Sequence, residues 1–273
     1  AHRFAHWFIK EGLLYSPPDL PQVARRHPMA SRLLDGAVQE IITASQYNPE
    51  DVVVEFQAIA DEAPDNLEGD PSSATADRLI NELKRLAPLM TESVAESFQI
   101  GTGPALQRID KLMNDAISEA GRGLPFGIEV LSALVARINE YRASVDLKQA
   151  EAVTAQNDGF AQVEDELLPK LRRTEAAFFA NILPGNRERI AKKLGEAIRE
   201  SRFGQLAAQE AAAEIRFLER VLERVRERRA ELEEAVRRLE RYAELEDRRF
   251  RSDQLIGKDA GTTDTTTFIL GDI

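Results

Sequence analysis

The amino-acid sequence predicts an all-α fold. The chain of 273 residues is rich in Ala, Leu, Glu and Arg, and only 6% of its residues are aromatic. This composition favours helices and is poor in strand formers. The clearest pattern is a 4-3 alternation in the C-terminal half, with one arginine in an otherwise apolar seam. The seam comprises Ala211, Ile215, Leu218, Leu222, Val225, Arg229, Leu232, Val236, Leu239 and Ala243.

We therefore expect three parts. Residues 1–120 form a small bundle of short helices, and residues 121–252 form a long antiparallel helical hairpin of the coiled-coil type with its tip near 181–186. Residues 253–273 form a polar linker and a short strand-like tail that ends in "TTTFILGDI". Two long helices joined by a short turn fold back on each other in this way because each must bury one apolar stripe.

Proline and glycine punctuate the first half, and they predict where its helices begin and end. Asn48 caps a helix that Pro49 opens, "PDNLEGDPSSATAD" is a polar loop, and Ser72 or Ser73 caps the following helix. A strand at Val52–Val54 is a second interpretation. The expected helices are 1–14, 28–46, 48–63, 73–86, 88–100 and 104–120.

The second half is predicted to be two arms. Residues 124–180 form the first arm with faults at Gly159 and Pro169, and residues 187–252 form the second. "NILPGN" is the turn between them, because Pro184-Gly185 stops one helix before the next begins. The seam of the first arm is expected to contain Leu131, Leu134, Ile138, Tyr141, Val145, Phe160, Val163, Leu167 and Leu171.

Charged residues flank the seam at helical spacing. Arg216–Glu219, Arg220–Glu223, Arg224–Glu227 and Arg228–Glu231 recur at i,i+3, and Glu233–Arg237 and Glu234–Arg238 recur at i,i+4. Such pairs contribute a few tenths of a kcal/mol each, so we expect this face to stay in water.

The tip of the hairpin is the strongest candidate for a binding site. Phe178, Phe179, Ile182 and Leu183 gather there, and adjacent helical residues lie about 100° apart, so all four cannot point inward. We interpret them as a contact patch for a protein partner, a neighbouring domain or another copy. The alternatives are that they cover the turn from inside, or that the tip touches a membrane, although no lysine cluster flanks the two rings.

Charge is spread unevenly along a chain whose net charge is −11. Asn48–Glu96 carries 12 acidic and 3 basic residues, whereas Asn186–Ser252 carries 15 acidic and 18 basic residues. We call Asn48–Glu96 the acidic front and Asn186–Ser252 the arginine-rich rear. Their charges either belong to ordinary solvated helix faces, or the acidic front packs on, or competes for, the arginine-rich rear. The net negative charge disfavours nucleic acid as a partner.

The sequence also predicts where the protein resides. It has no cysteine, which favours an intracellular, cytoplasmic setting. No apolar run approaches 18 residues and no signal-peptide pattern is present, so we expect a soluble chain that does not bind membranes. Both ends look cut, and we interpret the chain as part of a larger protein.

No motif predicts chemistry. His2 and His6 stand at i,i+4 without further metal ligands, and "IGTGPALQRID" lacks the lysine and spacing of a phosphate loop. "GKDAGTTDTTT" is interpreted as a polar linker. We expect no catalytic residues, no cofactor and no metal site.

One stretch has a family resemblance. "GRGLPFGIEVLSALVARINEY" followed by a charged arm and "EIRFLERVLERVRERRAELEEAVRRLERY" resembles the helical region of large bacterial tubulin-like proteins over Gly121–Ser252. The nucleotide signature of that family is absent, so the resemblance implies a helical accessory part of a filament- or GTPase-related protein and no nucleotide site.

The sequence thus predicts a non-enzymatic helical scaffold or protein-interaction segment of a larger multidomain protein. The alternative is an accessory or regulatory arm of a nucleotide hydrolase whose catalytic domain lies outside this chain.

Overall fold

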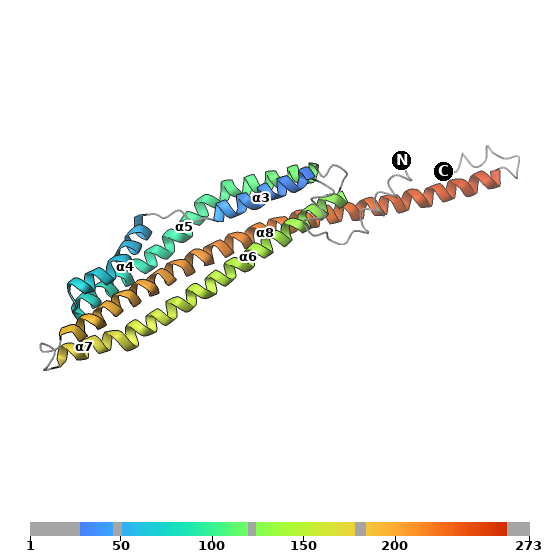
Figure 1. Cartoon of the computed structure of the whole chain (residues 1–273). Helices are drawn as coiled ribbons and strands as arrows, with labels where there is room; N and C mark the ends of the chain where they lie inside the picture. Colours follow the sequence, from blue (N-terminus) through green and yellow to red (C-terminus); the bar gives the residue numbers. More distant parts are fainter. Residues whose placement is uncertain (1–27, 46–50, 120–123, 178–183, 261–273) are drawn as a thin grey trace. The chain divides into compact units, whose positions relative to one another are not determined.

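The computed structural model describes residues 28–45, 51–119, 124–177 and 184–260, and every element in them is helical (Figure 1). The all-α prediction is therefore confirmed. The elements are α3 (Pro28–Ser45), α4 (Asp51–Gly69), α5 (Ser73–Glu119), α6 (Leu124–Ala161), a π-helical turn η1 (Gln162–Leu167), α7 (Leu168–Ala176) and α8 (Pro184–Ala260). The predicted helix 1–14, the Asn48–Pro49 cap and the strand-like tail over 261–273 lie outside the described residues.

Long helices replace the short helices that the sequence predicts for the first half. α4 runs through Pro64 to Gly69, so the predicted polar loop is helical at its start, and α5 runs through Pro88 and Pro104 as 47 residues. "IGTGP" accordingly lies inside α5 and does not separate two helices, as the predicted boundaries at 100 and 104 require. The Val52–Val54 segment is helical as well, which excludes the strand interpretation.

Burial explains why these prolines do not end their helices. The apolar period of α5 continues across Pro88, with buried side chains at Leu79, Ile80, Leu83, Leu86, Met90 and Val94. An internal proline costs about 3 kcal/mol, whereas each large apolar side chain gains about 1.5–3 kcal/mol on burial. The summed burial is larger, so the helix persists.

The short link between α4 and α5 is held by side-chain caps, as predicted for Ser72. The Ser72 hydroxyl accepts a hydrogen bond from the Thr75 amide at 3.1 Å, and the Ser72 and Thr75 hydroxyls both donate to the Asp70 carboxylate. The first bond satisfies an amide that the first helical turn leaves without a partner, and the two bonds to Asp70 hold the capping hydroxyl groups in place.

The first arm departs from ideal geometry where Pro169 was predicted to disturb it. Residues 162–167 form a π-helical turn, in which the Leu168 amide donates to the Val163 carbonyl. Pro169 has no amide hydrogen, and widening of the preceding turn accommodates that loss. Gly159 is not a fault; it lies within α6 and is buried.

The second arm begins earlier and ends later than predicted. Pro184 is the first residue of α8, so Pro184, Gly185 and Asn186 are helical and not part of a turn. This is the position at which a proline is tolerated, since the first amide of a helix has no intrahelical acceptor. At the other end, α8 continues to Ala260, so 253–260 is helix and not linker.

The chain divides into two compact units. Unit 2 comprises Val38–Asp110 and Arg137–Leu222, and unit 1 comprises the described parts of Ala1–Ala37, Lys111–Ala136 and Glu223–Ile273. Each unit therefore draws on both sides of residue 120.

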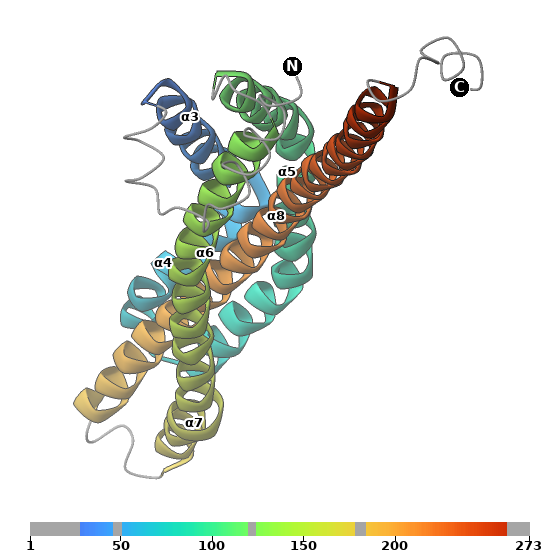
Figure 2. The same ribbon diagram turned by 90° about the vertical axis from the view of Figure 1, so that its right-hand side faces the viewer.

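Within unit 2, α6 and α7 run antiparallel to α8 (Figures 1 and 2). Arg142 pairs with Glu219 at 2.8 Å, Gly159 lies against Ser201, and Glu175 pairs with Arg187 at 3.8 Å. Residue numbers rise along the first arm as they fall along the second, which is the register of a helical hairpin.

The core of unit 2 joins α4 and α5 to this hairpin. It is one continuous apolar cluster whose members include Phe56, Leu83, Leu86, Met90, Leu171, Leu194 and Ile198. Gly195 of α8 permits the approach of α4, because a Cβ there would stand 2.6 Å from the Pro64 Cα. The absence of a side chain at this crossing lets the two backbones pack directly.

Within unit 1, α5, α6 and α8 meet at Gly127. A Cβ at this position would lie 2.9 Å from Leu232 Cδ1 and 3.0 Å from Ile117 Cγ2. Leu131 and Leu134 of α6 are buried, as are Leu232 and Val236 of α8.

Candidate functional site

The candidate residues at the predicted hairpin tip, Phe178, Phe179, Ile182 and Leu183, lie outside the described residues, so their role as a partner-binding patch stays a prediction. Four other features of the described residues are candidates for a role in function. They are a polar cluster among three helices, a hollow between α5 and α8, the acidic outer face of α4, and the C-terminal end of α8.

The polar cluster lies in unit 2 where α3, α6 and α8 meet. The Ser45 hydroxyl has two acceptors within reach of its single hydrogen, Glu214 Oε1 at 2.9 Å and the Ile42 carbonyl oxygen at 2.8 Å, and the Tyr141 hydroxyl donates to the same carboxylate oxygen. Burial raises the pKa of Tyr141, and its hydrogen bond to Glu214 raises it further. Burial also raises the pKa of Glu210, one turn before Glu214, and the charge of Glu214 adds to the shift.

This cluster is suited to joining helices. A buried polar group needs partners, and each member here finds them on another helix, so the network holds the end of α3 against the hairpin. Glu214 is the acceptor that the hydroxyl groups of Ser45 and Tyr141 share, so it links α8 to both α3 and α6.

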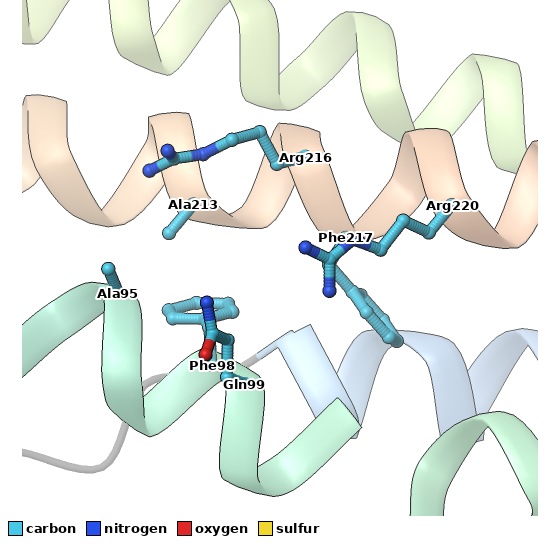
Figure 3. A pocket seen from close by; sticks show the side chains of 7 residues that line it. All are labelled: Ala95, Phe98, Gln99, Ala213, Arg216, Phe217 and Arg220. Carbon is cyan, nitrogen blue, oxygen red and sulfur yellow. The ribbon is translucent and has the colours of Figure 1, made fainter. Parts of the chain in front are cut away.

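The hollow between α5 and α8 is also in unit 2 and holds about 60 Å³ (Figure 3). Its walls come from both helices: Ala95, Phe98 and Gln99 from α5, and Ala213, Arg216, Phe217 and Arg220 from α8. The interior is apolar and the two arginines stand at the rim. Sites for metabolites usually measure about 300–1,000 Å³, so this hollow fits one side chain rather than a cofactor.

The two arginines at the rim are not paired with acids as their sequence spacing predicts. Arg216 donates from Nε to the Ala212 carbonyl at 3.3 Å, and within the described structure Arg220 has no ion pair. Glu219, the predicted partner of Arg216, instead reaches across the hairpin to Arg142. Figure 3 shows the Arg220 side chain extending back toward Phe98, while that of Arg216 runs along α8 toward Ala213.

The outer face of α4, in the same unit, is acidic. Asp51, Glu55, Asp61, Glu62, Asp65 and Glu68 are all exposed, and Val54 lies among them with half of its surface exposed. Glu55 approaches Arg85 at 3.9 Å, and the other five carboxylates have no ion pair with any residue that the structure describes.

Some charges of the acidic front are paired, mostly with α7 and the π-helical turn. Lys84 pairs with Glu164 at 2.9 Å, and Arg172 with Asp77 at 2.7 Å. From the arginine-rich rear, Arg187 donates to the Pro71 carbonyl at 2.6 Å. The acidic face of α4 stays outside these contacts.

The end of α8, in unit 1, exposes apolar side chains. Leu232 and Val236 are 6% and 2% exposed, whereas Leu239, Tyr242 and Leu245 are 45%, 70% and 61% exposed. Leu239 was predicted to continue the buried seam, and that prediction is wrong. The reason is that α6 begins at Leu124, only a turn before Gly127 meets Leu232, while α8 runs on to Ala260 (Figure 1).

The described residues contain no group of three His, Cys, Asp or Glu side chains placed to hold a metal ion. None of the described helices combines the length and the apolar character needed to cross a bilayer.

Comparison of the chain with protein-family models, with curated proteins and with solved structures finds no match.

Proposed function

We propose that the protein is a helical scaffold that binds other proteins by helix pairing, without catalysing a reaction itself. The observation that carries this proposal is the end of α8, where an apolar stripe continues past the start of its partner helix. Leu239, Tyr242 and Leu245 remain exposed there.

A helix of this kind gains stability from a partner. Isolated helices in water derive little stability from propensity alone, and most of it comes from packing an amphipathic face. Burial of the three exposed side chains would contribute about 1.5–3 kcal/mol each before the entropic cost of association is subtracted. A second helix with a matching 3-4 apolar repeat, in a coiled-coil arrangement, supplies that burial.

The charges around the stripe support a water-exposed helix that is ready to pair. Arg237 and Arg238 both contact Glu234, and Arg251 contacts Asp247. Pairs at i,i+3 and i,i+4 stabilise an exposed helix, although each contributes only a few tenths of a kcal/mol.

Site-specific photo-crosslinking in the native cells tests this function. A photoreactive phenylalanine analogue at position 242 or 245 should yield crosslinked products whose peptides carry a 3-4 apolar repeat. The same analogue at Arg241 or Arg248, exposed positions of the same segment, serves as the matched control. Equal crosslinking from all four positions, or none from any, would contradict helix pairing through this stripe.

A second experiment replaces the exposed apolar side chains at the end of α8 with polar ones. Changing Leu239, Tyr242 and Leu245 together to Gln should abolish the specific crosslinks made by the same analogue at Phe250, an exposed position further along α8. The far-ultraviolet circular dichroism of the free chain should stay nearly unchanged. The stripe is exposed, so its replacement by polar side chains costs the folded chain little.

A further inference from the structure

The charges near the end of α8 are divided along the helix. Residues 239–247 include four acidic residues and one arginine, whereas residues 248–251 include three arginines and no acidic residue. The segment 239–251 is therefore neutral as a whole, with a negative first part and a positive last part. Such a segment is complementary to a second copy of itself that runs in the opposite direction, because the acidic part of each then lies beside the basic part of the other.

Two of these charges lie on the apolar stripe itself. The intervals of three, four and three residues between them and two apolar residues put all four within about 80° around the helix. We call these four residues the exposed seam: Leu239, Tyr242, Glu246 and Arg249. All four are exposed, and neither Glu246 nor Arg249 has an ion pair with any residue that the structure describes.

The neighbouring charges do not belong to the exposed seam. Arg251 pairs with Asp247 of the same helix at 3.6 Å. Glu244 and Arg248 project from the side of α8 that faces away from the seam, since successive residues turn by about 100°. Each copy thus offers one acid and one base, three residues apart, to a helix that covers its seam.

We propose that the end of α8 pairs in antiparallel orientation with the end of α8 in a second copy, so that Glu246 of each copy meets Arg249 of the other. This inference rests on the proposed function, and it names the partner of the apolar stripe. A two-fold axis passes between residues 247 and 248, and positions equally far from it on the two copies lie level. The contact is isologous, so it closes as a dimer.

The same register covers the apolar part of the exposed seam. Leu239 and Tyr242 lie level with residues 253–256 of the second copy, where α8 is still helical, since it continues to Ala260. A shift by one heptad toward the N-terminus would instead set Tyr242 against Glu246 and Leu239 against Arg249. Each charge would then be covered by an apolar side chain without a partner, which costs free energy. The charges therefore select one register.

A parallel pair of helices suits the charges less well. In register, it places Glu246 beside Glu246 of the second copy and Arg249 beside Arg249. Like charges that face each other across a contact oppose association. The antiparallel arrangement replaces both repulsions with attractions, so the charges select the orientation as well as the register.

The association is weak and reversible. Two helix ends of this length bury less than the roughly 1,200 Å² of stable complexes. The net charge of −11 on each copy also opposes their approach, whereas the neutral segment 239–251 adds no net repulsion of its own. The dimer therefore forms at high protein concentration, and single charges in the exposed seam decide how much of it forms.

Analytical ultracentrifugation of the chain over a range of concentrations tests the proposal. We expect the wild-type chain to dimerise. Glu246→Arg sets arginine against arginine twice in each dimer, and Arg249→Glu sets glutamate against glutamate twice, so each should weaken dimerisation by about tenfold or more. The chain that carries both changes has the net charge of the wild type and unlike pairs again, and it should dimerise as the wild type does.

Matched controls make the same charge changes away from the exposed seam. Glu244→Arg and Arg248→Glu lie at exposed positions on the other side of α8, and each should alter dimerisation by about twofold or less. Circular dichroism should show the same helicity for all of these variants, because every changed side chain is exposed.

Weakening by both single changes, with recovery in the double variant, supports the antiparallel dimer. Dimerisation that the single changes leave intact, or that the double variant fails to recover, overturns it. A chain that stays monomeric at all concentrations, while a photoreactive group at position 242 crosslinks to a different protein, also overturns it but leaves the proposed function standing. Absence of specific crosslinks from position 242 to any chain, this one included, is the separate result that contradicts the proposed function.

Discussion

Gly204 of α8 packs directly on the backbone of Gln156 in α6. A Cβ at position 204 would stand 2.8 Å from the Gln156 amide nitrogen and 3.0 Å from the Ala152 carbonyl oxygen. Neither backbone atom can move aside without displacing a helix. Together with Gly159, which faces Ser201 in the same way, this glycine sets how closely the two arms of the hairpin approach in unit 2.

We predict that Gly204→Ala destabilises the protein by about 1–3 kcal/mol, even though alanine favours helices more than glycine does. The loss arises because the added methyl group separates α6 from α8. Urea denaturation followed by circular dichroism measures the change. Gly103→Ala is the matched control, because a Cβ at this position of α5 meets no atom within 4 Å, and we expect it to be neutral or stabilising.

A second prediction concerns the polar cluster. Tyr141→Phe removes the hydrogen bond to Glu214 but leaves the one from Ser45, so we expect a loss of about 0.5–1.5 kcal/mol. Glu214→Leu should cost more, because it leaves the hydroxyl groups of both Ser45 and Tyr141 without this acceptor. Equal losses from the two variants would show that the carboxylate is not the centre of the network.

The same cluster predicts how Tyr141 titrates. Its pKa is raised above the usual 10.0 by burial and by its hydrogen bond to Glu214, so the stability it contributes is present below pH 10 and is lost as pH rises through the higher folded-state value. Titration of the chain with base, followed by the absorbance of tyrosinate, measures the pKa of the tyrosines. The difference between the wild-type chain and Tyr141→Phe gives the titration of Tyr141. Glu214→Gln removes the charge and should bring the pKa down toward 10, whereas an unchanged titration would contradict the assignment.

A third prediction concerns the link between α4 and α5. Hydrogen bonds from Thr75 and Ser72 lower the pKa of Asp70 below 3.8, and the charge of Arg187 acts in the same direction. The stability that Asp70 contributes is therefore present above about pH 4 and is lost as pH falls through its lower folded-state value. We expect Asp70→Asn to reduce the fall in the free energy of unfolding that urea denaturation measures as pH is lowered from about 4. Asp65→Asn, on the exposed face of α4, is the control and should leave that fall unchanged.

The sequence predicts the helices well but not their ends. Helical periodicity identified the seam of α8, and Leu218, Leu222, Val225, Leu232 and Val236 are all buried. Pro64, Pro88 and Pro104 were taken as boundaries, and each lies inside a helix. The rule that a proline ends a helix fails where buried apolar side chains continue on both sides of the proline. That burial depends on tertiary contacts, which a single sequence does not display.

The candidate sites were harder to predict for the same reason. The spacing Arg216–Glu219 predicts a local pair, yet Glu219 contacts Arg142 of the other arm. The hollow exists because Phe98 of α5 and Phe217 of α8 lie together, 119 positions apart in the chain, and no motif marks such a meeting. The start of α6 at Leu124 was predicted correctly, but the exposed end of α8 follows from the register of the two arms, in which Gly127 meets Leu232. The periodicity of each arm alone does not display that register.

The last prediction concerns a buried charge. Arg202 of α8 is only 4% exposed; its guanidinium lies 4.2 Å from the centre of the Phe160 ring and donates to Gln205 at 2.8 Å. Burial lowers its pKa from 12.5 to about 10, partly opposed by the charge of Glu164. A lowered pKa for a cationic group means that the fold penalises the charged form. The penalty is present at neutral pH and diminishes only as pH rises through about 10.

Arg202→Met keeps most of the volume of the side chain, retains a sulfur–aromatic contact with Phe160 and removes the buried charge, so we expect it to be neutral or to stabilise the chain by about 1–2 kcal/mol. Arg202→Ala removes the charge but leaves a cavity, and it should destabilise the chain by about 2 kcal/mol or more. Melting temperatures of the two variants and the wild type near neutral pH provide the comparison. A Met variant that melts as low as the Ala variant would show that the cation–π contact and the hydrogen bond to Gln205 outweigh the desolvation of the guanidinium. The charge would then stabilise α6 against α8 instead of opposing their packing.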